Sequence, residues 1–391
     1  MSTTLTTTET TTDVATRDPS PTAASAQPLL RPLDVGGLTL PNRVVMAPMT
    51  RARAAEETLA PGAAHAAYYA QRASAGLIIT EGTWTSERAI GFTHVPGVYR
   101  EEQVAGWRRV TDAVHALGGR IVLQLWHTGA ASHPDHLGGA LPAGPSAINP
   151  RVRSFTRDGF RETVVPRAMT RAEIADTVAE FRSAAERARR AGFDGVEIGA
   201  LGTFLLAQFL NPRLNHRDDA YGADRVGRRR LLLEVVDAVA ETWPDGCVGV
   251  RVAPYWHDGD RFVADEPLLA DYDELAAELG DRPVSYLHLR GPEPAGPEAA
   301  PDPAAFARYR SRFAGPLIVN NGFDRATGNA ALAAGVADAV SYARHYVANP
   351  DLVARFALGR ALSPGDPATY YGGGAEGYVD YPASNWGAPP A

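Results

Sequence analysis

The sequence predicts an α/β fold, a single (β/α)8 barrel of the TIM type, and three observations carry this prediction. Short apolar, β-branched runs alternate with helical patterns along most of the chain. The runs are apolar almost throughout, which is typical of parallel strands that are buried on both faces. No G-x-G-x-x-G motif follows the first run, as a doubly wound dinucleotide-binding sheet would require, so that open sheet is the less favoured alternative.

The chain is expected to form one folded domain behind a polar tail. Residues 1–28 are rich in threonine and serine and have almost nothing apolar to bury, so they are predicted to be disordered. Residues 29–391 are predicted to form the barrel. The pair Gly36-Gly37 followed by Leu-Thr-Leu at 38–40 is typical of a short hairpin, which we expect to precede the first barrel strand.

Eight strands and the helices between them follow in order. The predicted strands are Val44–Met49, Leu77–Glu81, Arg120–Trp126, Gly195–Ile198, Cys247–Val252, Ser285–Leu289, Pro316–Asn320 and Ala339–Tyr342. A capping box from Thr170 to Glu173 predicts one helix start, and Asn349 before Pro350 predicts another. The stretch from His127 to Met169 is rich in Gly, Pro and charge, and it predicts a long loop insertion after the third strand that serves as a lid.

Composition excludes several classes of function. The chain has 45 acidic and 38 basic residues, for a formal net charge of −7, and every basic residue is an arginine. Without lysine there is neither a Schiff base to pyridoxal phosphate nor a P-loop. The acidic balance argues against a nucleic-acid partner, and no apolar run is long enough for a membrane span. The lone Cys247 excludes internal disulfides and thiolate metal sites, which fits a cytoplasmic protein.

Polar residues and glycines gather where the predicted strands end, which is the active face of a (β/α)8 barrel. They are Pro48, Thr50, Gly82, Gln124, Arg251, Asn321, Gly322, Ala343 and Arg344. Singly, each has a structural explanation, such as a helix cap for Thr50 or a buried ion pair for Arg251. Together they suit flavin mononucleotide (FMN), with Arg344 and turn N–H groups on the phosphate and Gln124 and Thr50 at the ring carbonyls. Arg251 would stabilise negative charge near the flavin N1.

Four motifs carry a family resemblance. They are PNRVVMAPMTR at 41–51, YAQRASAG at 69–76, VLQLWHTG at 122–129 and YGGGAEGY at 371–378, and they lie within a similarity that runs from about Leu29 to Pro382. The chain resembles the Old Yellow Enzyme family, whose members are FMN-containing (β/α)8 barrels that reduce activated alkenes with NAD(P)H. The resemblance implies FMN contacts for Thr50, Gly82, Gln124, Arg251, Gly322 and Arg344, and pocket walls for Trp126 and Tyr371. Core packing explains Trp126 alone equally well.

The sequence departs from the family's pattern where the substrate is bound. The family's fourth strand continues as a His-x-x-Asn or His-x-x-His pair that binds the substrate carbonyl and the nicotinamide carboxamide, followed by a proton-donating tyrosine. Alignment without gaps places Gly199, Gly202 and Phe204 at these positions, and Phe92 replaces a second pocket tyrosine. Ordinary enone reduction is therefore expected to be very slow, and flavin reduction by NAD(P)H stays open.

Three residues are candidates for a substitute acid or donor, namely His257, Tyr371 and His94. For His257, a solvated loop histidine is the simpler explanation. Three hypotheses of function remain: hydride transfer at the flavin N5 to or from a bulky specialised-metabolite substrate; a redox-neutral isomerase or cyclase, or an oxidase or desaturase; and ligand binding without catalysis. We expect a small-molecule partner, NAD(P)H as a candidate reductant, no metal, and a monomer or homodimer.

Overall fold

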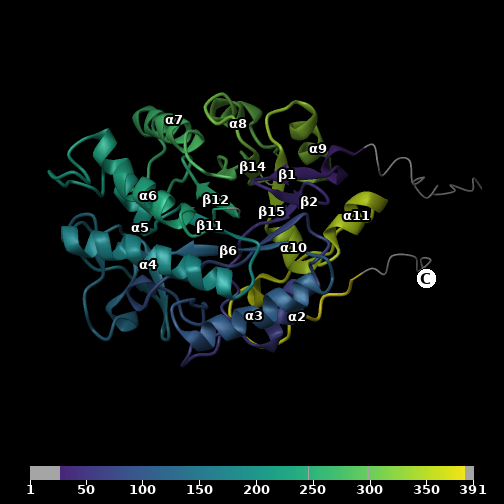
Figure 1. Ribbon diagram of the computed structural model, residues 1–391, viewed down its shortest axis with the longest axis horizontal. Coiled ribbons are helices and arrows are strands. Elements are labelled where there is room, and N and C mark those ends of the chain that lie inside the picture. Colours follow the sequence, from purple (N-terminus) through teal and green to yellow (C-terminus); the bar gives the residue numbers. More distant parts are fainter. Residues whose placement is uncertain (1–26, 245, 297–298, 384–391) are drawn as a thin grey trace, which may run out of the picture.

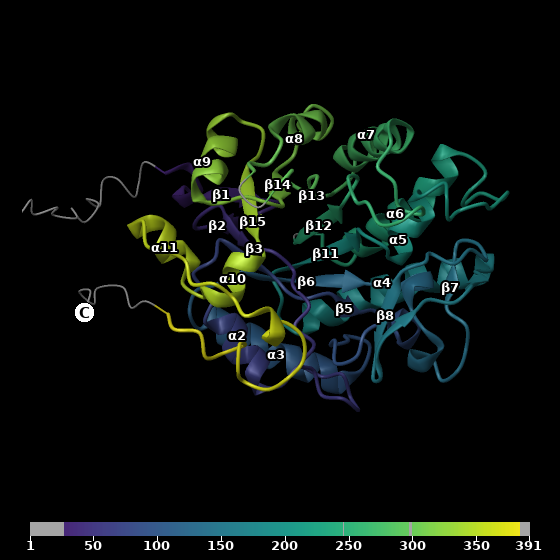
Figure 2. The ribbon, with the colours of Figure 1, turned by 180° about the vertical axis from the view of Figure 1, so that it is seen from behind.

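The protein is a closed barrel of eight parallel strands with helices around the outside (Figures 1 and 2). The computed structural model describes residues 27–383 except 245 and 297–298. The barrel strands are β3 (Val44–Met46), β4 (Leu77–Ile79), β6 (Ile121–Trp126), β11 (Gly195–Ala200), β12 (Cys247–Val252), β13 (Tyr286–Arg290), β14 (Leu317–Asn320) and β15 (Ala339–Tyr342). Pairing of β11 with β6 and of β15 with β3 closes the ring.

Helices follow the strands as the alternating pattern predicted. They are α2 (Ala63–Ala70), α3 (Glu101–His115), α4 (Arg171–Arg190), α5 (Leu205–Leu210), α6 (Arg225–Ala240), α7 (Glu266–Gly280), α8 (Pro303–Arg310), α9 (Arg325–Ala333), α10 (Arg344–Ala348) and α11 (Leu352–Leu358), with short 3-10 turns at η1 (Pro28–Leu30), η2 (Glu87–Ala89) and η5 (Pro367–Thr369). The predicted (β/α)8 barrel is therefore confirmed. The open doubly wound sheet is excluded because the strands close on themselves.

Of the two predicted helix starts, one is confirmed and one is wrong. The Thr170 hydroxyl accepts a hydrogen bond from the backbone N–H of Glu173, so α4 begins with the predicted capping box. The prediction at Asn349 is wrong, because this residue ends α10 and Asp351 precedes α11. The Asn349 side chain instead ties α10 to the following loop, since its Nδ2 donates to the carbonyl oxygens of His345 and Ser363.

The predicted N-terminal hairpin closes the amino-terminal end of the barrel. Strands β1 (Leu33–Val35) and β2 (Leu38–Leu40) pair antiparallel around Gly36-Gly37, both of which have positive φ. Val35 and Leu40 pack against the inward-facing residues at the start of the barrel strands, including Val45. A Cβ atom at Gly36 would lie 2.0 Å from Oγ of Ser285, so the turn sits directly on the barrel. Function is thereby confined to the opposite, carboxyl-terminal end.

The insertion after the third barrel strand is present between β6 and α4. It contains η3 (Gly129–Ala131), η4 (Pro134–His136) and the short strands β7 (Ala143–Gly144), β8 (Arg153–Thr156), β9 (Gly159–Glu162) and β10 (Arg167–Ala168). The β8–β9 hairpin leans on the loop that follows β5 (Thr83–Trp84), since Phe155 pairs with Phe92 and Oγ of Ser154 donates to the Gly91 carbonyl at 2.9 Å. It is thus placed above the carboxyl-terminal strand ends, and its role as a lid stays a prediction.

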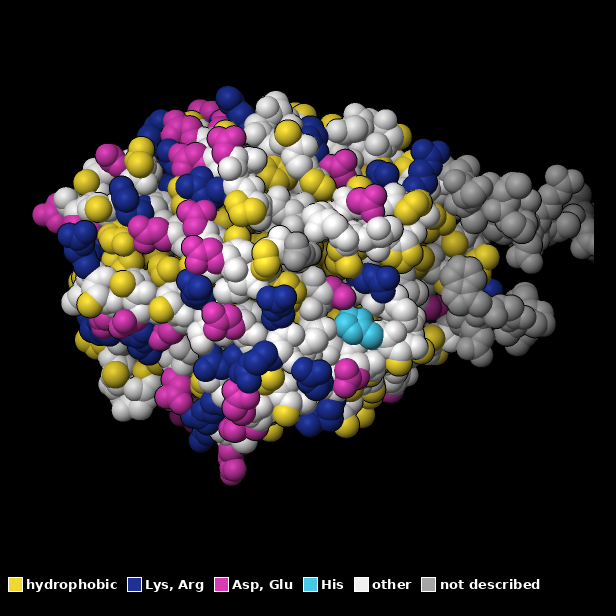
Figure 3. All heavy atoms as spheres, viewed as in Figure 1, with side chains coloured by type: hydrophobic (Ala, Val, Ile, Leu, Met, Phe, Trp, Pro, Cys, Tyr) yellow, Lys and Arg dark blue, Asp and Glu magenta, His cyan; other side chains and the backbone are white. Residues whose placement is uncertain are grey.

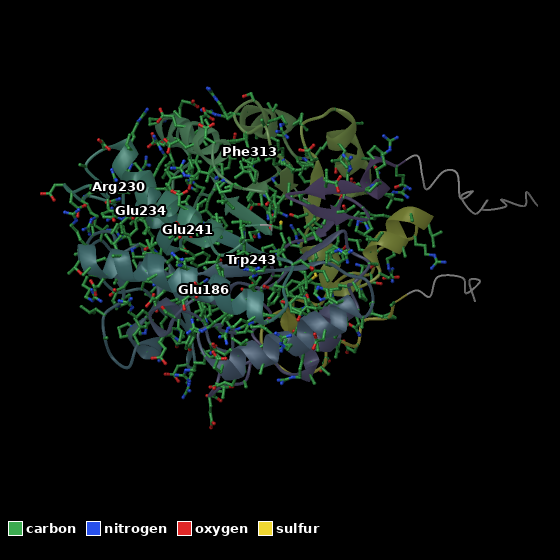
Figure 4. All side chains as sticks on the ribbon, in the orientation of Figure 1. Glu186, Arg230, Glu234, Glu241, Trp243 and Phe313 are labelled. Atoms are coloured by element: carbon green, nitrogen blue, oxygen red, sulfur yellow. The ribbon has the colours of Figure 1, made fainter. Side chains whose placement is uncertain are left out.

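The outer surface mixes acidic and basic side chains, as Figure 3 shows for one face. Figure 4 places Glu186 on α4 beside Glu241 at the end of α6, and Arg182 forms ion pairs with both. Trp243 joins the same helices by donating from Nε1 to the Ala185 carbonyl at 3.3 Å. In the part of the chain that the structure describes, no helix is long and apolar enough to cross a membrane.

The predicted domain boundary falls near the start of the described residues. Gln27 and Pro28 are described, and Pro28 opens η1, whose Leu29 is buried against the barrel. Residues 1–26 of the predicted tail and 384–391 of the predicted barrel lie outside the described residues.

Candidate functional site

An anion-binding corner lies where β14 and β15 end. Asn321, Gly322, Ala343 and Arg344 line one cavity of about 520 Å³. Among the described residues, the backbone N–H groups of Gly322 and Ala343 have no acceptor, and the exposed Arg344 guanidinium forms no hydrogen bond or ion pair, although its charge helps to lower the pKa of Glu293. Free N–H donors beside a free guanidinium form a site for a phosphate group. Four residues predicted to bind the cofactor phosphate are therefore brought together.

Backbone constraints explain the residue types in this corner. Gly322 has φ +78°, and a Cβ atom there would lie 2.4 Å from Cγ of Pro294. Asn321 also has a positive φ, of 95°, which asparagine tolerates better than most residues. Its Nδ2 donates to the Pro292 carbonyl at 2.8 Å and ties the β13–α8 loop to the corner. The turn after β14 therefore requires residues that tolerate positive φ, and the Asn321-Gly322 pair supplies them.

Arg251 lies at the carboxyl-terminal end of the barrel strands, here called the mouth, and only part of its guanidinium is hydrogen-bonded. Its Nη2 donates to Oδ1 of Asn320 at 3.0 Å, while its buried Nε has no partner among the described residues. Burial lowers the pKa of Arg251 to about 10, against the opposing pull of the Glu197 carboxylate, so the guanidinium stays protonated at neutral pH. A buried cation with a free N–H fits an electron-rich edge of a flavin ring.

Glu197 is the buried counter-charge beneath the mouth, and the sequence analysis did not single it out. Its carboxylate accepts hydrogen bonds from Nε2 of Gln124 at 2.8 Å and from Nδ1 of His288 at 2.8 Å. Nε2 of His288 meets Oγ of Ser341 at 2.7 Å, so the histidine is satisfied structurally. Burial opposes the charge on Glu197, but His288, Arg251 and Gln124 together hold its pKa below the ordinary value. The signal that could have revealed it is a carboxylate within an apolar strand.

Gln124 is in part a satisfied core amide, since its Nε2 donates to Oε1 of Glu197 at 2.8 Å. Its predicted contact with a carbonyl of the flavin ring stays a prediction. Its Oε1 accepts no hydrogen bond from any described residue and is not sealed from solvent. The amide is thus oriented from below and presents an acceptor at the mouth, as a flavin ring N–H requires.

A second buried carboxylate, Glu81, fixes the loop after β3 that carries Pro48 and Thr50. Its Oε2 accepts the backbone N–H groups of Arg51 at 3.1 Å and Ala52 at 3.3 Å. Burial raises the pKa of Glu81 to about 7, although these two N–H groups and the nearby arginines oppose the shift. The loop conformation, and with it the position of Thr50, therefore depends on a buried acid that the sequence analysis did not single out.

Arg51 links the same loop to the C-terminal segment. Its guanidinium donates to the carbonyl oxygens of Tyr370 at 3.0 Å and Gly377 at 2.8 Å. The backbone N–H of Gly372 returns a bond to the Arg51 carbonyl at 3.0 Å. Tyr371, between these anchors, is 59% exposed. The motif at 41–51 and the motif at 371–378 are thus joined by hydrogen bonds, although they lie at opposite ends of the chain.

An aromatic wall borders the substrate side of the mouth. Trp126 stacks on Trp84 with ring centroids 4.6 Å apart, meets Phe204 edge-on at 4.5 Å and lies 5.7 Å from Phe92. A Cβ atom at Gly82 would lie 2.1 Å from Cε3 of Trp126, so this glycine makes room for the indole. Trp126 is therefore a packed core residue, and its role as a wall of the substrate pocket stays a prediction.

Gly199 and Gly202 carry no side chain beside this wall. A Cβ atom at Gly199 would lie 3.2 Å from the Leu125 carbonyl oxygen and 3.6 Å from Cδ of Gln124, which places the glycine next to that amide. Gly202 has φ +61°, and its Cβ atom would lie 3.6 Å from the Phe204 ring and 3.9 Å from Trp256. Neither position offers a hydrogen-bond donor on a side chain, and Phe204 offers no acid. Trp256, which borders Gly202, is absent from the sequence predictions.

The three candidate acids are not brought together. His257 is exposed and makes no hydrogen bond or ion pair with any described residue. His94 has φ +57°, and its Nδ1 lies 3.3 Å from the Ala54 carbonyl in a shallow cavity that Phe92 also lines. Among the described residues His257, His94 and Tyr371 make no contact with one another, so each catalytic role stays a prediction.

Comparison with known proteins gives the same assignment as the geometry. Residues 28–363 match the model of the NADH:flavin oxidoreductase / NADH oxidase family. The chain belongs to this family. It is 38% identical to 12-oxophytodienoate reductase 1 of Oryza sativa subsp. japonica, over 92% of this chain and 94% of that one. It is also 38% identical to a Leishmania infantum protein named "Probable flavin mononucleotide-dependent alkene reductase", over 93% and 99% of the two chains.

The solved structures agree. Morphinone reductase in complex with tetrahydroNAD superposes with a TM-score of 0.86 at 43% identity, covering 93% of this chain and 99% of the other. The resemblance to the Old Yellow Enzyme family is therefore confirmed, and this flavin oxidoreductase shares the family's TIM barrel. The free N–H groups, Arg344 and the unpaired Nε of Arg251 fit an FMN molecule laid across the strand ends.

Proposed function

We propose that this flavin oxidoreductase uses FMN to transfer hydride to or from a bulky specialised-metabolite substrate, without the family's carbonyl-binding pair or its tyrosine acid. The observation that carries the proposal is the contrast within the mouth: the cofactor-facing groups are present and oriented, while positions 199, 202 and 204 hold Gly199, Gly202 and Phe204. Two glycines in place of two ring or amide side chains widen the pocket, which suits a large, rigid substrate.

The chain's own groups account for cofactor binding. Arg344 and the N–H groups of Gly322 and Ala343 would hold the phosphate, and Asn321 shapes that turn. Pro48, Thr50, Gly82 and Gln124 would contact the ring, and Arg251 would offer positive charge to it. When bound, FMN supplies two-electron hydride chemistry at its N5. NAD(P)H is the proposed reductant.

The groups that are missing at positions 199, 202 and 204 determine how much slower enone reduction is expected to be. A hydrogen bond aimed at a developing oxyanion contributes on the order of 10²–10³ in rate, and a positioned general acid about 10²–10⁴. Phe204 packs edge-on against Trp126 and can exclude water, but it cannot deliver a proton. A substrate must therefore bring its own activation, or find an acid among His257, His94 and Tyr371, as predicted from sequence.

Hydride removal from the substrate is the second candidate function. Desaturation or oxidation needs a base, because the substrate loses a proton together with the hydride. Phe204 cannot accept that proton, so water or one of His257, His94 and Tyr371 would have to. A redox-neutral isomerase or cyclase is compatible with the same pocket. Membership in a family of oxidoreductases favours these enzymatic functions over a non-catalytic barrel. A cytoplasmic location and a monomeric or homodimeric state remain predictions from sequence.

Spectroscopy and turnover test the proposal together. The purified protein is expected to be yellow, with absorbance near 450 nm, and to oxidise NADPH with cyclohexenone at least ~10²-fold more slowly than a relative that keeps the His/Asn/Tyr set. Colourless protein that cannot be reconstituted with FMN would contradict the cofactor assignment. Rapid cyclohexenone turnover would contradict the proposed loss of substrate activation.

A further inference from the structure

A second cation stands at the barrel mouth beside Arg251. Arg290 is the last residue of β13 and lies opposite Asn320 in the register with β14. Asn320 accepts the hydrogen bond from Arg251, so the two arginines flank one asparagine. Burial lowers the pKa of Arg251, and the positive charge of Arg290 contributes to that lowering. Arg290 thus belongs to the mouth and not to the outer surface.

Trp256 connects Arg290 to Gly202. The Arg290 guanidinium lies over the Trp256 ring, with Cζ 4.7 Å from the ring centroid. The same indole is the neighbour of Gly202, where a Cβ atom would come within 3.9 Å of it. Trp256 is held from the other side by residues of the insertion and the β12–α7 loop, including Val152 and Phe262. The cation is therefore fixed at the edge of the pocket.

The partner of Arg290 can give way to a ligand. Arg290 pairs with Glu293 of the loop that follows β13. The Glu293 side chain is 67% exposed, whereas that of Arg290 is 16% exposed. Burial opposes the charge on Glu293, but Arg290, Asn321 and Arg344 together hold its pKa below the ordinary value, so this carboxylate has stabilising partners besides Arg290. An ion pair with an exposed carboxylate contributes little, because water screens it. A ligand carboxylate that meets the guanidinium with both oxygens would form two charge-assisted hydrogen bonds in its place.

We propose that Arg290 binds a carboxylate of the substrate, so that this flavin oxidoreductase acts on an organic acid. The assignment rests on the proposed function, because it takes the space beside Gly202 as the substrate pocket. Arg344 and Arg251 are the cations suited to the cofactor, which leaves Arg290 for the substrate. Its planar fork binds a carboxylate through two parallel hydrogen bonds, and the bond would anchor the substrate from the side opposite Phe204.

A matched pair of ligands tests this assignment on the FMN-loaded enzyme. The probes are 3-oxocyclohex-1-ene-1-carboxylate and its methyl ester, and calorimetry and the shift of the flavin absorbance report the two dissociation constants. We expect the wild-type enzyme to bind the acid at least about 10-fold more tightly than the ester, because one charge-assisted bond distinguishes them. This preference should shrink as salt is raised.

Variants separate the charge of Arg290 from its packing. Arg290→Gln should abolish the preference for the acid and leave ester binding within about twofold, whereas Arg290→Lys should retain most of it. The matched control is Arg282→Gln, which removes another ion-paired arginine of the same βα unit at the opposite end of β13. That control should leave both dissociation constants unchanged.

Several outcomes would overturn the inference. A wild-type enzyme that prefers the ester, or an Arg290→Gln enzyme that keeps the preference for the acid, would show that Arg290 does not bind the carboxylate. Loss of FMN from Arg290→Gln would assign the cation to the cofactor instead. In each of these cases the proposed function survives. Protein that cannot be loaded with FMN, or a holoenzyme that binds neither compound, would overturn both.

Discussion

The two halves of the barrel mouth are built from different kinds of residue. On the cofactor half, Arg251, Gln124 and the turn at Gly322 present free donors and acceptors that are oriented from below by buried partners. On the substrate half, Gly199 and Gly202 carry no polar side chain, and the donors without a partner are the indole N–H groups of Trp126 and Trp256. If the proposed function holds, one scaffold keeps its cofactor chemistry while the neighbouring surface takes a different substrate.

Restoring the substrate half should have the largest effect. The triple variant Gly199→His, Gly202→Asn and Phe204→Tyr supplies two donors and an acid, and we expect cyclohexenone reduction to rise by about 100-fold or more. The measurement is NADPH oxidation by the holoenzyme under steady-state conditions. The control is Gly199→Leu, Gly202→Ala and Phe204→Leu, which fills similar space without polar groups and should give no gain. Equal rates in both variants would mean that the pocket has diverged beyond these three positions.

Glu81 tests how far the cofactor half depends on a buried acid. Its pKa is raised from 4.5 to about 7 in the folded state, so folded protein holds a proton that unfolded protein releases between these values. This contribution to stability is present below pH 4.5 and is lost as the pH rises through 7, by up to about 3 kcal/mol. Glu81→Gln should therefore be more stable relative to wild type at pH 8 than at pH 5.

Denaturant unfolding at the two pH values measures this difference in the free energy of unfolding. Glu186→Gln is the control, because Glu186 is an exposed carboxylate on α4 (Figure 4). It should shift the free energy of unfolding little and equally at both pH values. A Glu81→Gln effect that is the same at pH 5 and pH 8 would contradict the assignment of a raised pKa.

Arg344 tests the phosphate corner directly. Replacing it by alanine removes an exposed guanidinium that forms no hydrogen bond or ion pair with a described residue, so the change should act on the ligand more than on the fold. We expect the dissociation constant for FMN to rise about 10- to 100-fold, as loss of one charge-assisted bond implies. Quenching of FMN fluorescence by the apoprotein measures it. Arg312→Ala, an exposed arginine that precedes β14 at the opposite end, should leave FMN binding unchanged.

The smallest expected effect concerns the backbone of the substrate half. Gly202 has φ +61°, so Gly202→Ala should lower the free energy of unfolding by about 1 kcal/mol. Gly202→Asn should cost less, because asparagine tolerates this conformation. Gly62→Ala serves as the control, since Gly62 has φ −103° and open space around it. If Gly202→Ala and Gly202→Asn lowered the free energy of unfolding equally, the backbone conformation at position 202 would not favour asparagine over alanine.

Local patterns made much of the fold predictable. Apolar runs located all eight strands, and the glycine pair located the hairpin, because both are properties of contiguous residues. The first strand ends at Met46 and not at Met49, since residues 47–50 leave the sheet to form the loop that Glu81 holds. The helix start at Asn349 failed for a similar reason: its side chain finds a partner at Ser363, which local pattern does not reveal.

The residues of the candidate site also fall into those that local sequence predicted and those that it did not. Strand-end positions predicted Arg251, Gln124 and the Asn-Gly corner, because parallel strands bring their carboxyl ends to one face. Glu81, Glu197, Trp256 and Arg290 were not predicted. Their importance lies in partners from distant segments, such as His288 for Glu197 and Trp256 for Arg290.

By itself, then, the sequence determined the order of strands and helices, the all-arginine set of cations and the absence of donors at 199, 202 and 204. Only the tertiary structure decided which charges are buried, which are paired and which face the mouth. The physical reason is that burial and pairing depend on contacts between residues far apart in the chain. Hydrophobic periodicity, in contrast, is written into neighbouring residues.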